Sequence, residues 1–210
     1  MQRRIIHWRV FILSLMVFFS LSTVSPASAA VPAPTAASVL AKIQSSSDPQ
    51  RTYQALTPAE RAAFDLEYAP AAMVPLPSPA TSPPPYSITS TTKCWEYART
   101  WNVNNQIGKT LFTYWSRVRW CSDGIRVTSA TTSDRGGETR TPFYHFRGNL
   151  GSGSLSLYSE NRRYVQERFT FEVPSPWGNV VVSDYVYCAQ LRVGTTYERH
   201  SGLANCNLYA

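Results

Sequence analysis

The clearest pattern in the sequence is an alternation of apolar and polar residues between Lys93 and Val127. If Cys94 lies opposite Cys121 in an antiparallel hairpin, one face becomes almost wholly apolar, with the pairs Trp95–Trp120, Tyr97–Val118, Trp101–Tyr114 and Val103–Phe112. The other face then carries the pairs Glu96–Arg119, Ala98–Arg117, Thr100–Trp115 and Asn102–Thr113. A slip of one residue would mix the two faces, because side chains alternate along a strand. The pattern therefore predicts this hairpin in this register.

The remaining chain after residue 87 consists of short alternating runs separated by Gly, Pro, Asn and Asp. Asp123-Gly124 predicts a two-residue turn that places Val127 opposite Trp120. We expect strands at 125–131, 142–147, 155–159, 164–173 and 180–193, and exposed loops at Ser133–Arg140 and Asn149–Ser154. About seven such strands predict an all-β fold, an antiparallel β-sandwich, with a β-barrel as the second choice.

The strands at 164–173 and 180–193 predict a second hairpin, in which Val173 faces Val180 and Phe171 faces Val182. Glu167 and Asp184 would interrupt its apolar face, so we expect a bulge partway along it.

The N-terminal 29 residues have the organisation of a signal peptide. Arg3, Arg4 and Arg9 precede an apolar run from residue 10 to 24, and Ala27-Ser28-Ala29 is a small-residue cleavage site. The alternative is a membrane anchor, but the run is shorter than the roughly 20 residues that a span needs. We therefore expect a secreted protein, with no membrane association after cleavage.

Residues 30–86 form a lead of low complexity. Thr57, Pro58 and Glu60 predict the start of a short helix over 58–68, because Ser or Thr followed three residues later by Glu makes a capping box. Seven prolines between residues 70 and 86 predict an extended linker, which places the domain boundary near residue 87. The lead is interpreted as a tether, with a pro-segment or a partner-binding helix as the alternative.

The four cysteines are expected to form disulfides, because an exported chain meets an oxidising compartment. The hairpin register favours Cys94–Cys121, which leaves Cys188–Cys206. A bridge between Cys121 and Cys188 across two sheets is the rival pairing. The spacing contains no close cysteine pair, so no metal site and no cofactor are expected.

The charge of the chain and a search for catalytic motifs exclude few classes of function. The net charge is +7, but no dense run of Lys and Arg exists, so nucleic acid is not an expected partner. His145 and His200 lie in no recognisable nucleophile motif, and each is interpreted as an ordinary strand or loop residue. A glycan hydrolase would need paired carboxylates, for which the candidates are Glu160, Glu167, Glu172 and Asp184.

Aromatic residues on faces that should be polar give the best functional clue. Flat rings beside charged groups suit sugars, whose apolar faces stack on aromatic rings while their hydroxyl groups form hydrogen bonds. The candidate ligand-binding residues are Trp115, Arg117, Arg119, Glu96, Trp177, Tyr185 and Tyr187. For each Trp the alternative is burial under an edge of the fold.

The residues Cys94, Trp95, Gly108, Leu111, Trp115, Val118, Trp120, Cys121, Asp123 and Gly124 form a pattern over roughly residues 90–130. This pattern resembles that of small secreted Cys- and Trp-rich β-domain proteins of actinomycetes, the high-GC Gram-positive bacteria. That group has no assigned activity, so the resemblance implies a fold and a location but contributes no catalytic residue.

The sequence thus predicts a secreted, non-catalytic binding module for cell-wall or environmental carbohydrate. A protein–protein module such as a secreted inhibitor, which would use the loops Ser133–Arg140 and Asn149–Ser154, is the alternative. A glycan hydrolase is the second alternative, and the oligomeric state is left open.

Overall fold

The computed structural model describes residues 32–78, 92–176 and 178–210. The predicted signal peptide, residues 79–86 of the predicted linker and Trp177 lie outside the described residues. Residues 33–210 form one compact unit.

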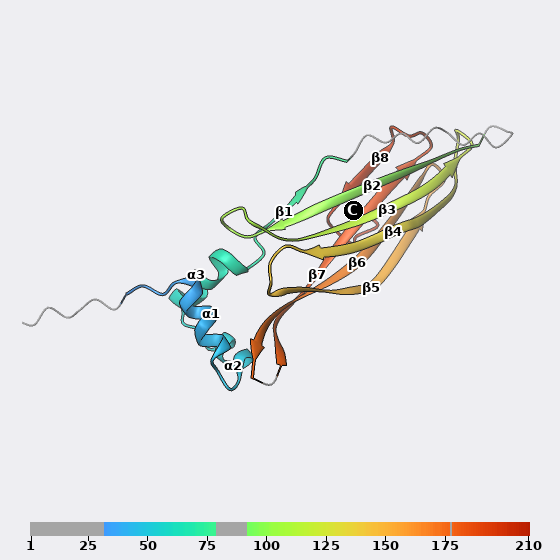
Figure 1. Cartoon of the computed structure of the whole chain (residues 1–210). Coiled ribbons are helices and arrows are strands. Elements are labelled where there is room, and N and C mark those ends of the chain that lie inside the picture. The colour runs from blue at the N-terminus through green and yellow to red at the C-terminus, as the bar shows by residue number, and fades with distance from the viewer. Residues whose placement is uncertain (1–31, 79–91, 177) are drawn as a thin grey trace, which may run out of the picture. The chain divides into compact units, whose positions relative to one another are not determined.

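Eight strands of the described chain form two antiparallel four-stranded sheets, which confirms the predicted β-sandwich (Figure 1). The first sheet, in the order β1-β2-β3-β4, contains β1 (Ala72–Pro75), β2 (Lys93–Asn104), β3 (Thr110–Ser122) and β4 (Val127–Thr139). The second, in the order β5-β6-β7-β8, contains β5 (Tyr144–Ser156), β6 (Glu160–Ser175), β7 (Gly178–Gly194) and β8 (His200–Leu203). The two sheets remain separate, so the barrel alternative is wrong.

The β2–β3 hairpin has the predicted register from Cys94–Cys121 to Val103–Phe112, and a bulge follows at its end. Its apolar face lies in the core between the sheets. Phe112 stacks on Phe169 of β6 with ring centroids 4.1 Å apart, and Tyr114 contacts Tyr187 of β7. Trp120 is fully buried and donates its indole N–H to the Gly194 carbonyl at 3.0 Å. The alternation in sequence therefore identified the face that holds the sheets together.

The turn between β3 and β4 is wider than predicted. Ser122 faces Val127, whereas Trp120 faces Ala130 rather than Val127. The Asp123 carboxylate accepts hydrogen bonds from the backbone N–H groups of Ile125 and Arg126, at 2.9 and 2.8 Å. These bonds satisfy the turn internally, so Asp123-Gly124 opens a four-residue turn instead of a two-residue one.

The segments predicted as the exposed loops Ser133–Arg140 and Asn149–Ser154 are largely strand, a correction to the sequence interpretation. Residues 133–139 belong to β4 and residues 149–154 to β5. Each is the outermost strand on its side of a sheet, where a polar sequence protects an exposed edge. Their glycines allow close approach of aromatic side chains: a Cβ on Gly137 would overlap the rings of Phe169 and Phe146.

The β6–β7 hairpin begins in the predicted register, with Val173 opposite Val180, and shifts by one residue between Phe171 and Glu172. Beyond this bulge Phe171 faces Ser183 instead of the predicted Val182, and Val165 faces Ala189. The expected interruption of the register is thus present, and it decides which β7 side chains face the core.

The described part of the lead, residues 32–78, packs on the β-domain rather than forming a tether. It contains α1 (Ala36–Gln44), α2 (Pro49–Gln54) and α3 (Pro58–Tyr68), of which only the last was predicted. Figure 1 shows these helices beside one end of the β6–β7 hairpin. Phe64 of α3 is buried, and its ring meets the Phe171 ring edge-on, with ring centroids 5.4 Å apart. The Tyr144 hydroxyl donates to the Tyr68 carbonyl at 2.6 Å.

The capping box predicted for α3 is present. The Thr57 hydroxyl accepts from the Glu60 backbone N–H at 3.3 Å, and Glu60 accepts in return from the Thr57 backbone N–H at 2.9 Å.

The first part of the predicted proline linker is also integrated into the fold. Residues 72–75 form β1, which pairs with β2 from Asn104 to Trp101. Pro75 is tolerated because β1 lies at the edge of the sheet, where one row of backbone groups needs no partner. The compact unit therefore extends through the boundary expected near residue 87.

Both predicted disulfides are formed, Cys94–Cys121 across β2 and β3 and Cys188–Cys206 between β7 and the C-terminal segment. Two disulfides are typical of extracellular proteins. Within the described ranges, no helix has the length and apolar character that crossing a membrane requires.

Candidate functional site

The outer face of the first sheet gathers four of the predicted ligand-binding residues. In the observed register Glu96 lies opposite Arg119, and Thr100 lies opposite Trp115. Arg117 lies between Trp115 and Arg119 on the same face of β3, because side chains two residues apart share a face. The hairpin thus presents the predicted aromatic and charged side chains on one surface.

Trp115 is the central side chain of this surface, and it is half-buried. Its position is fixed from two directions. Gly136 of β4 lies directly opposite, and a Cβ there would lie only 2.7 Å from the indole ring, so the ring covers this glycine. The indole N–H donates to the Asp134 carboxylate at 3.2 Å. The ring is held by its edge and by one face, while part of it stays open to solvent.

A shallow groove of about 470 Å³ runs beside Trp115. Its walls are hydroxyl, amide and charged side chains together with one aliphatic residue. It is lined by Leu76, Thr100, Asn102, Thr110, Thr113, Trp115, Glu138 and Arg140. Hydrogen-bonding groups around a partly exposed indole are the combination that sugar recognition requires.

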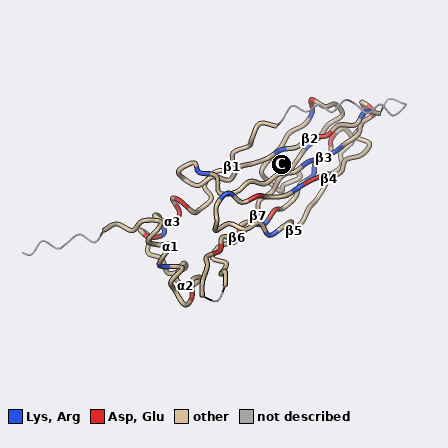
Figure 2. The backbone as a smooth tube through the Cα atoms, viewed as in Figure 1, with Lys and Arg blue, Asp and Glu red and all other residues tan. Residues whose placement is uncertain are grey.

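The charged residues near the groove differ in how they are engaged. Arg117 and Arg119 are exposed, whereas Glu96 is half-buried and accepts a hydrogen bond from the Ser133 hydroxyl at 2.8 Å. Arg140 and Glu138 form an exposed ion pair at 2.8 Å. On β3 the charged residues are Arg117 and Arg119, whereas β4 carries both acidic and basic residues, so the two strands together do not form a field of one sign (Figure 2).

Tyr185 and Tyr187 are not on this surface, which corrects their assignment as ligand-binding residues. Tyr187 points between the sheets and contacts Phe112, with ring centroids 5.2 Å apart. Tyr185 packs against Tyr144. The one-residue shift between Phe171 and Glu172 reverses which β7 side chains face inward, so both tyrosines line the core. Trp177 lies outside the described residues.

The four carboxylates considered for glycoside hydrolysis do not converge. Glu167 points into the core and is fully buried, whereas Glu172, five residues later on β6, lies on the opposite face. There it is ion-paired with Arg147. Asp184 pairs with Arg168 at 2.6 Å, and Glu160 pairs with Arg162 at 2.7 Å. The described geometry therefore gives no support to a two-carboxylate mechanism among these residues.

Two of the three carboxylates of β6, Glu167 and Glu172, have pKa values that are shifted in opposite directions. Burial raises the pKa of Glu167, and weaker effects of Arg135 and of the nearby Asn149 amide lower it. Neither of its oxygens has a partner at hydrogen-bonding distance and angle. Asn149, which pairs with Glu167 from β5, donates its amide to the carbonyls of Gly151 and Gln166. For Glu172, burial opposes ionisation, but Thr170, Arg147 and His145 together lower its pKa.

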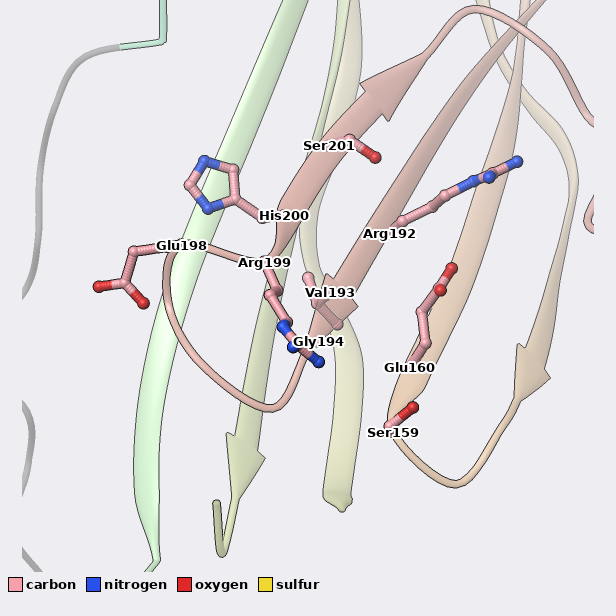
Figure 3. Close-up of a pocket in the computed structure, with 9 residues that line it drawn as sticks. All are labelled: Ser159, Glu160, Arg192, Val193, Gly194, Glu198, Arg199, His200 and Ser201. Atoms are coloured by element: carbon pink, nitrogen blue, oxygen red, sulfur yellow. The ribbon is translucent and has the colours of Figure 1, made fainter. Parts of the chain in front are cut away.

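A second hollow, of about 370 Å³, lies at the β7–β8 end of the other sheet (Figure 3). Its charged side chains do not all converge: His200 and Glu198 point away from Glu160 and Arg192, and Arg199 is drawn between these two groups. The His200 ring packs on Tyr97 with centroids 4.0 Å apart, and its Nδ1 contacts the Tyr197 carbonyl. His200 is thus a packing residue, and His145 is a half-exposed residue of β5, as the sequence indicated.

A third hollow, of about 590 Å³, lies where the β4 edge approaches β5. Arg163 of β6 spans it, donating to the Ala130 carbonyl at 2.9 Å and to the Thr132 hydroxyl at 3.3 Å. These bonds link the two sheets, so Arg163 has a structural role.

The sequence did not identify the remaining groove residues. Thr100, Asn102 and Thr113 were placed on the correct face by the register, but as polar residues they gave no sign of function. Glu138 and Arg140 were assigned to a loop. The signal that could have found them is the pairing of β4 with β3, which sets Glu138 opposite Thr113.

Comparisons with known proteins found no matching family model, no matching curated protein and no matching solved structure.

Proposed function

We propose that the protein is a secreted, non-catalytic module that binds cell-wall or environmental carbohydrate on the outer face of its β1–β4 sheet. The observation that supports this most is the partly open Trp115 indole in a groove of hydroxyl, amide and charged side chains. Secretion rests on the signal-like N-terminus and accords with the two disulfides.

Trp115 would stack on the apolar face of a sugar ring. Its fixed position favours this, because a ring already held by Gly136 and Asp134 loses little conformational freedom when a ligand binds. Asn102, Glu138 and Arg140 would exchange hydrogen bonds with hydroxyl groups, since they line the groove and have donor or acceptor atoms available.

The experiment is a pull-down of the secreted chain on insoluble chitin, cellulose and peptidoglycan. Trp115→Leu keeps an apolar side chain over Gly136 but removes the aromatic face, and it is expected to abolish retention. Tyr158→Ala is the matched control, because Tyr158 is an aromatic residue that is 69% exposed and lies outside the groove. Retention that is unaffected by Trp115→Leu, or absent on every polymer, would refute the proposal.

A further inference from the structure

The groove beside Trp115 crosses the strands instead of running along one of them. Its lining comes from all four strand positions of the sheet: Leu76 just after β1, Asn102 from β2, Trp115 from β3 and Glu138 from β4. Neighbouring strands lie about 4.8 Å apart, so three spacings give a groove roughly 14 Å long. That length exceeds one sugar ring and suits several units of a chain.

The charge of the groove differs from the charge of the chain. The full sequence has a net charge of +7, which on its own would favour an anionic polymer. Within the groove, however, one carboxylate and one guanidinium occur, and they are paired with each other. Beyond the groove, Arg117 faces Asp134 and Arg119 faces Glu96, so the wider surface is balanced as well.

The Glu138–Arg140 pair is suited to rearrangement by a ligand. Both side chains are about half exposed, at 54% and 52%, and an exposed ion pair contributes little stability. Separating them to meet a ligand therefore costs little. Together they present an acceptor and a fork of donors, which can bind neighbouring hydroxyl groups of one sugar unit.

From these observations, and resting on the carbohydrate-binding function proposed above, we infer that the ligand is an uncharged polysaccharide. Several units of its chain lie across the strands. Trp115 stacks on one unit, and Glu138 and Arg140 bind the hydroxyl groups of another and set the selectivity of the site.

The test is isothermal titration calorimetry of the whole secreted chain with soluble polymers. Hydroxyethyl cellulose and arabinoxylan serve as uncharged probes and polygalacturonate as the anionic probe, each at about 50 and about 500 mM NaCl, which spans weak and strong screening. We expect binding to at least one uncharged polymer, with an affinity that changes less than about threefold between the two salt concentrations. Oligosaccharides of that polymer should gain affinity up to three or four units and then no further.

The variant Glu138→Gln/Arg140→Gln should weaken this binding about tenfold, because it removes the charge from two or more hydrogen bonds. Both side chains are exposed, so the fold should be retained, which circular dichroism checks. The matched control is Lys93→Gln/Lys109→Gln, which alters two exposed charged residues outside the groove and should leave the affinity unchanged.

Different failures have different meanings. Trp115-dependent binding to polygalacturonate that collapses at the higher salt concentration would overturn the uncharged ligand but keep the carbohydrate site. Full affinity for a single sugar unit, or no effect of the Glu138/Arg140 variant, would overturn the extended chain or the selectivity. Binding to none of these soluble polymers, together with no retention on chitin, cellulose or peptidoglycan, would overturn both this inference and the proposed function.

Discussion

Replacing Glu167 by glutamine is expected to stabilise the protein at neutral pH. Glu167 is 0% exposed, and both of its carboxylate oxygens lack a hydrogen-bond partner between the sheets. An ionised carboxylate in such a place has lost its hydration, and the weaker effects of Arg135 and Asn149 offset only part of that loss. A glutamine side chain has nearly the same shape and no charge, so the substitution Glu167→Gln isolates the cost of ionisation.

The magnitude is the extra cost of the charge, because a glutamine amide at this place would be buried without partners as well. Leaving a buried polar group without partners costs about 1–3 kcal/mol and more when the group is charged, so we expect the difference between the two side chains to be about 2 kcal/mol at pH 7 or above. The pKa of Glu167 is raised in the folded state, so its contribution to stability is complete below its unfolded pKa of about 4.3. That contribution is lost as the pH rises through the folded pKa. The advantage of the variant should therefore be near zero at pH 4, grow through the mildly acidic range and then level off.

The assay is urea unfolding with both disulfides intact, between pH 4 and pH 8. With a urea dependence of about 2 kcal/mol per molar, a gain of about 2 kcal/mol shifts the midpoint by about 1 M. Glu172→Gln is the matched control on the same strand. The pKa of Glu172 is lowered in the folded state, so its contribution is present at neutral pH and lost as the pH falls through that pKa.

Glu172→Gln should therefore destabilise the protein at pH 7, by about 2 kcal/mol for the lost charged hydrogen bonds, with a cost that shrinks in acid. A Glu167→Gln variant that is less stable than the parent at pH 7 would refute the reasoning. So would a gain that is the same at every pH.

Two further predictions concern packing. Phe64→Ala should lower the free energy of unfolding by about 3–5 kcal/mol, because Phe64 is 2% exposed against Phe171, whereas Leu66→Ala on the exposed side of α3 should have little effect. Equal thermal midpoints for these two variants would show that the helices do not stabilise the sheets. Gly137→Ala should cost about 1–3 kcal/mol in urea unfolding, because its Cβ would overlap Phe169 and Phe146. Gly151→Ala meets only the flexible end of Gln166, and a cost as large as that of Gly137→Ala would contradict this account.

The β2–β3 hairpin could be predicted residue by residue because two independent signals agreed. The alternation of side chains and the opposition of Cys94 and Cys121 both require the same register. On the β6–β7 hairpin the alternation conflicted with Glu167, and the sequence could indicate a bulge but not its position. The position of the bulge determines which β7 side chains face the core, because the shift between Phe171 and Glu172 places Tyr187 in the core.

The edge strands and the lead were harder to predict for a common reason. A strand such as β5 forms by pairing with β6, and its Gly and Ser residues carry no hydrophobic signal of their own. In α1, Val39, Leu40 and Ile43 are buried, but they stand among Ala and Ser residues and form a stripe too short to recognise. Half of the candidate site follows from the β2–β3 register. Its Glu138–Arg140 wall depends on a strand that only tertiary structure reveals.

The contact between Phe64 and Phe171 has a consequence for how the chain folds. The two residues are more than a hundred positions apart, and the Tyr68–Tyr144 hydrogen bond joins residues 76 positions apart. Contacts between distant segments slow folding, because the entropy of loop closure is lost before the contacts form. The helices that emerge first during synthesis must therefore wait for β5 and β6 before they can bury their apolar side chains. A nascent chain that ends before residue 171 should still be unfolded in this region.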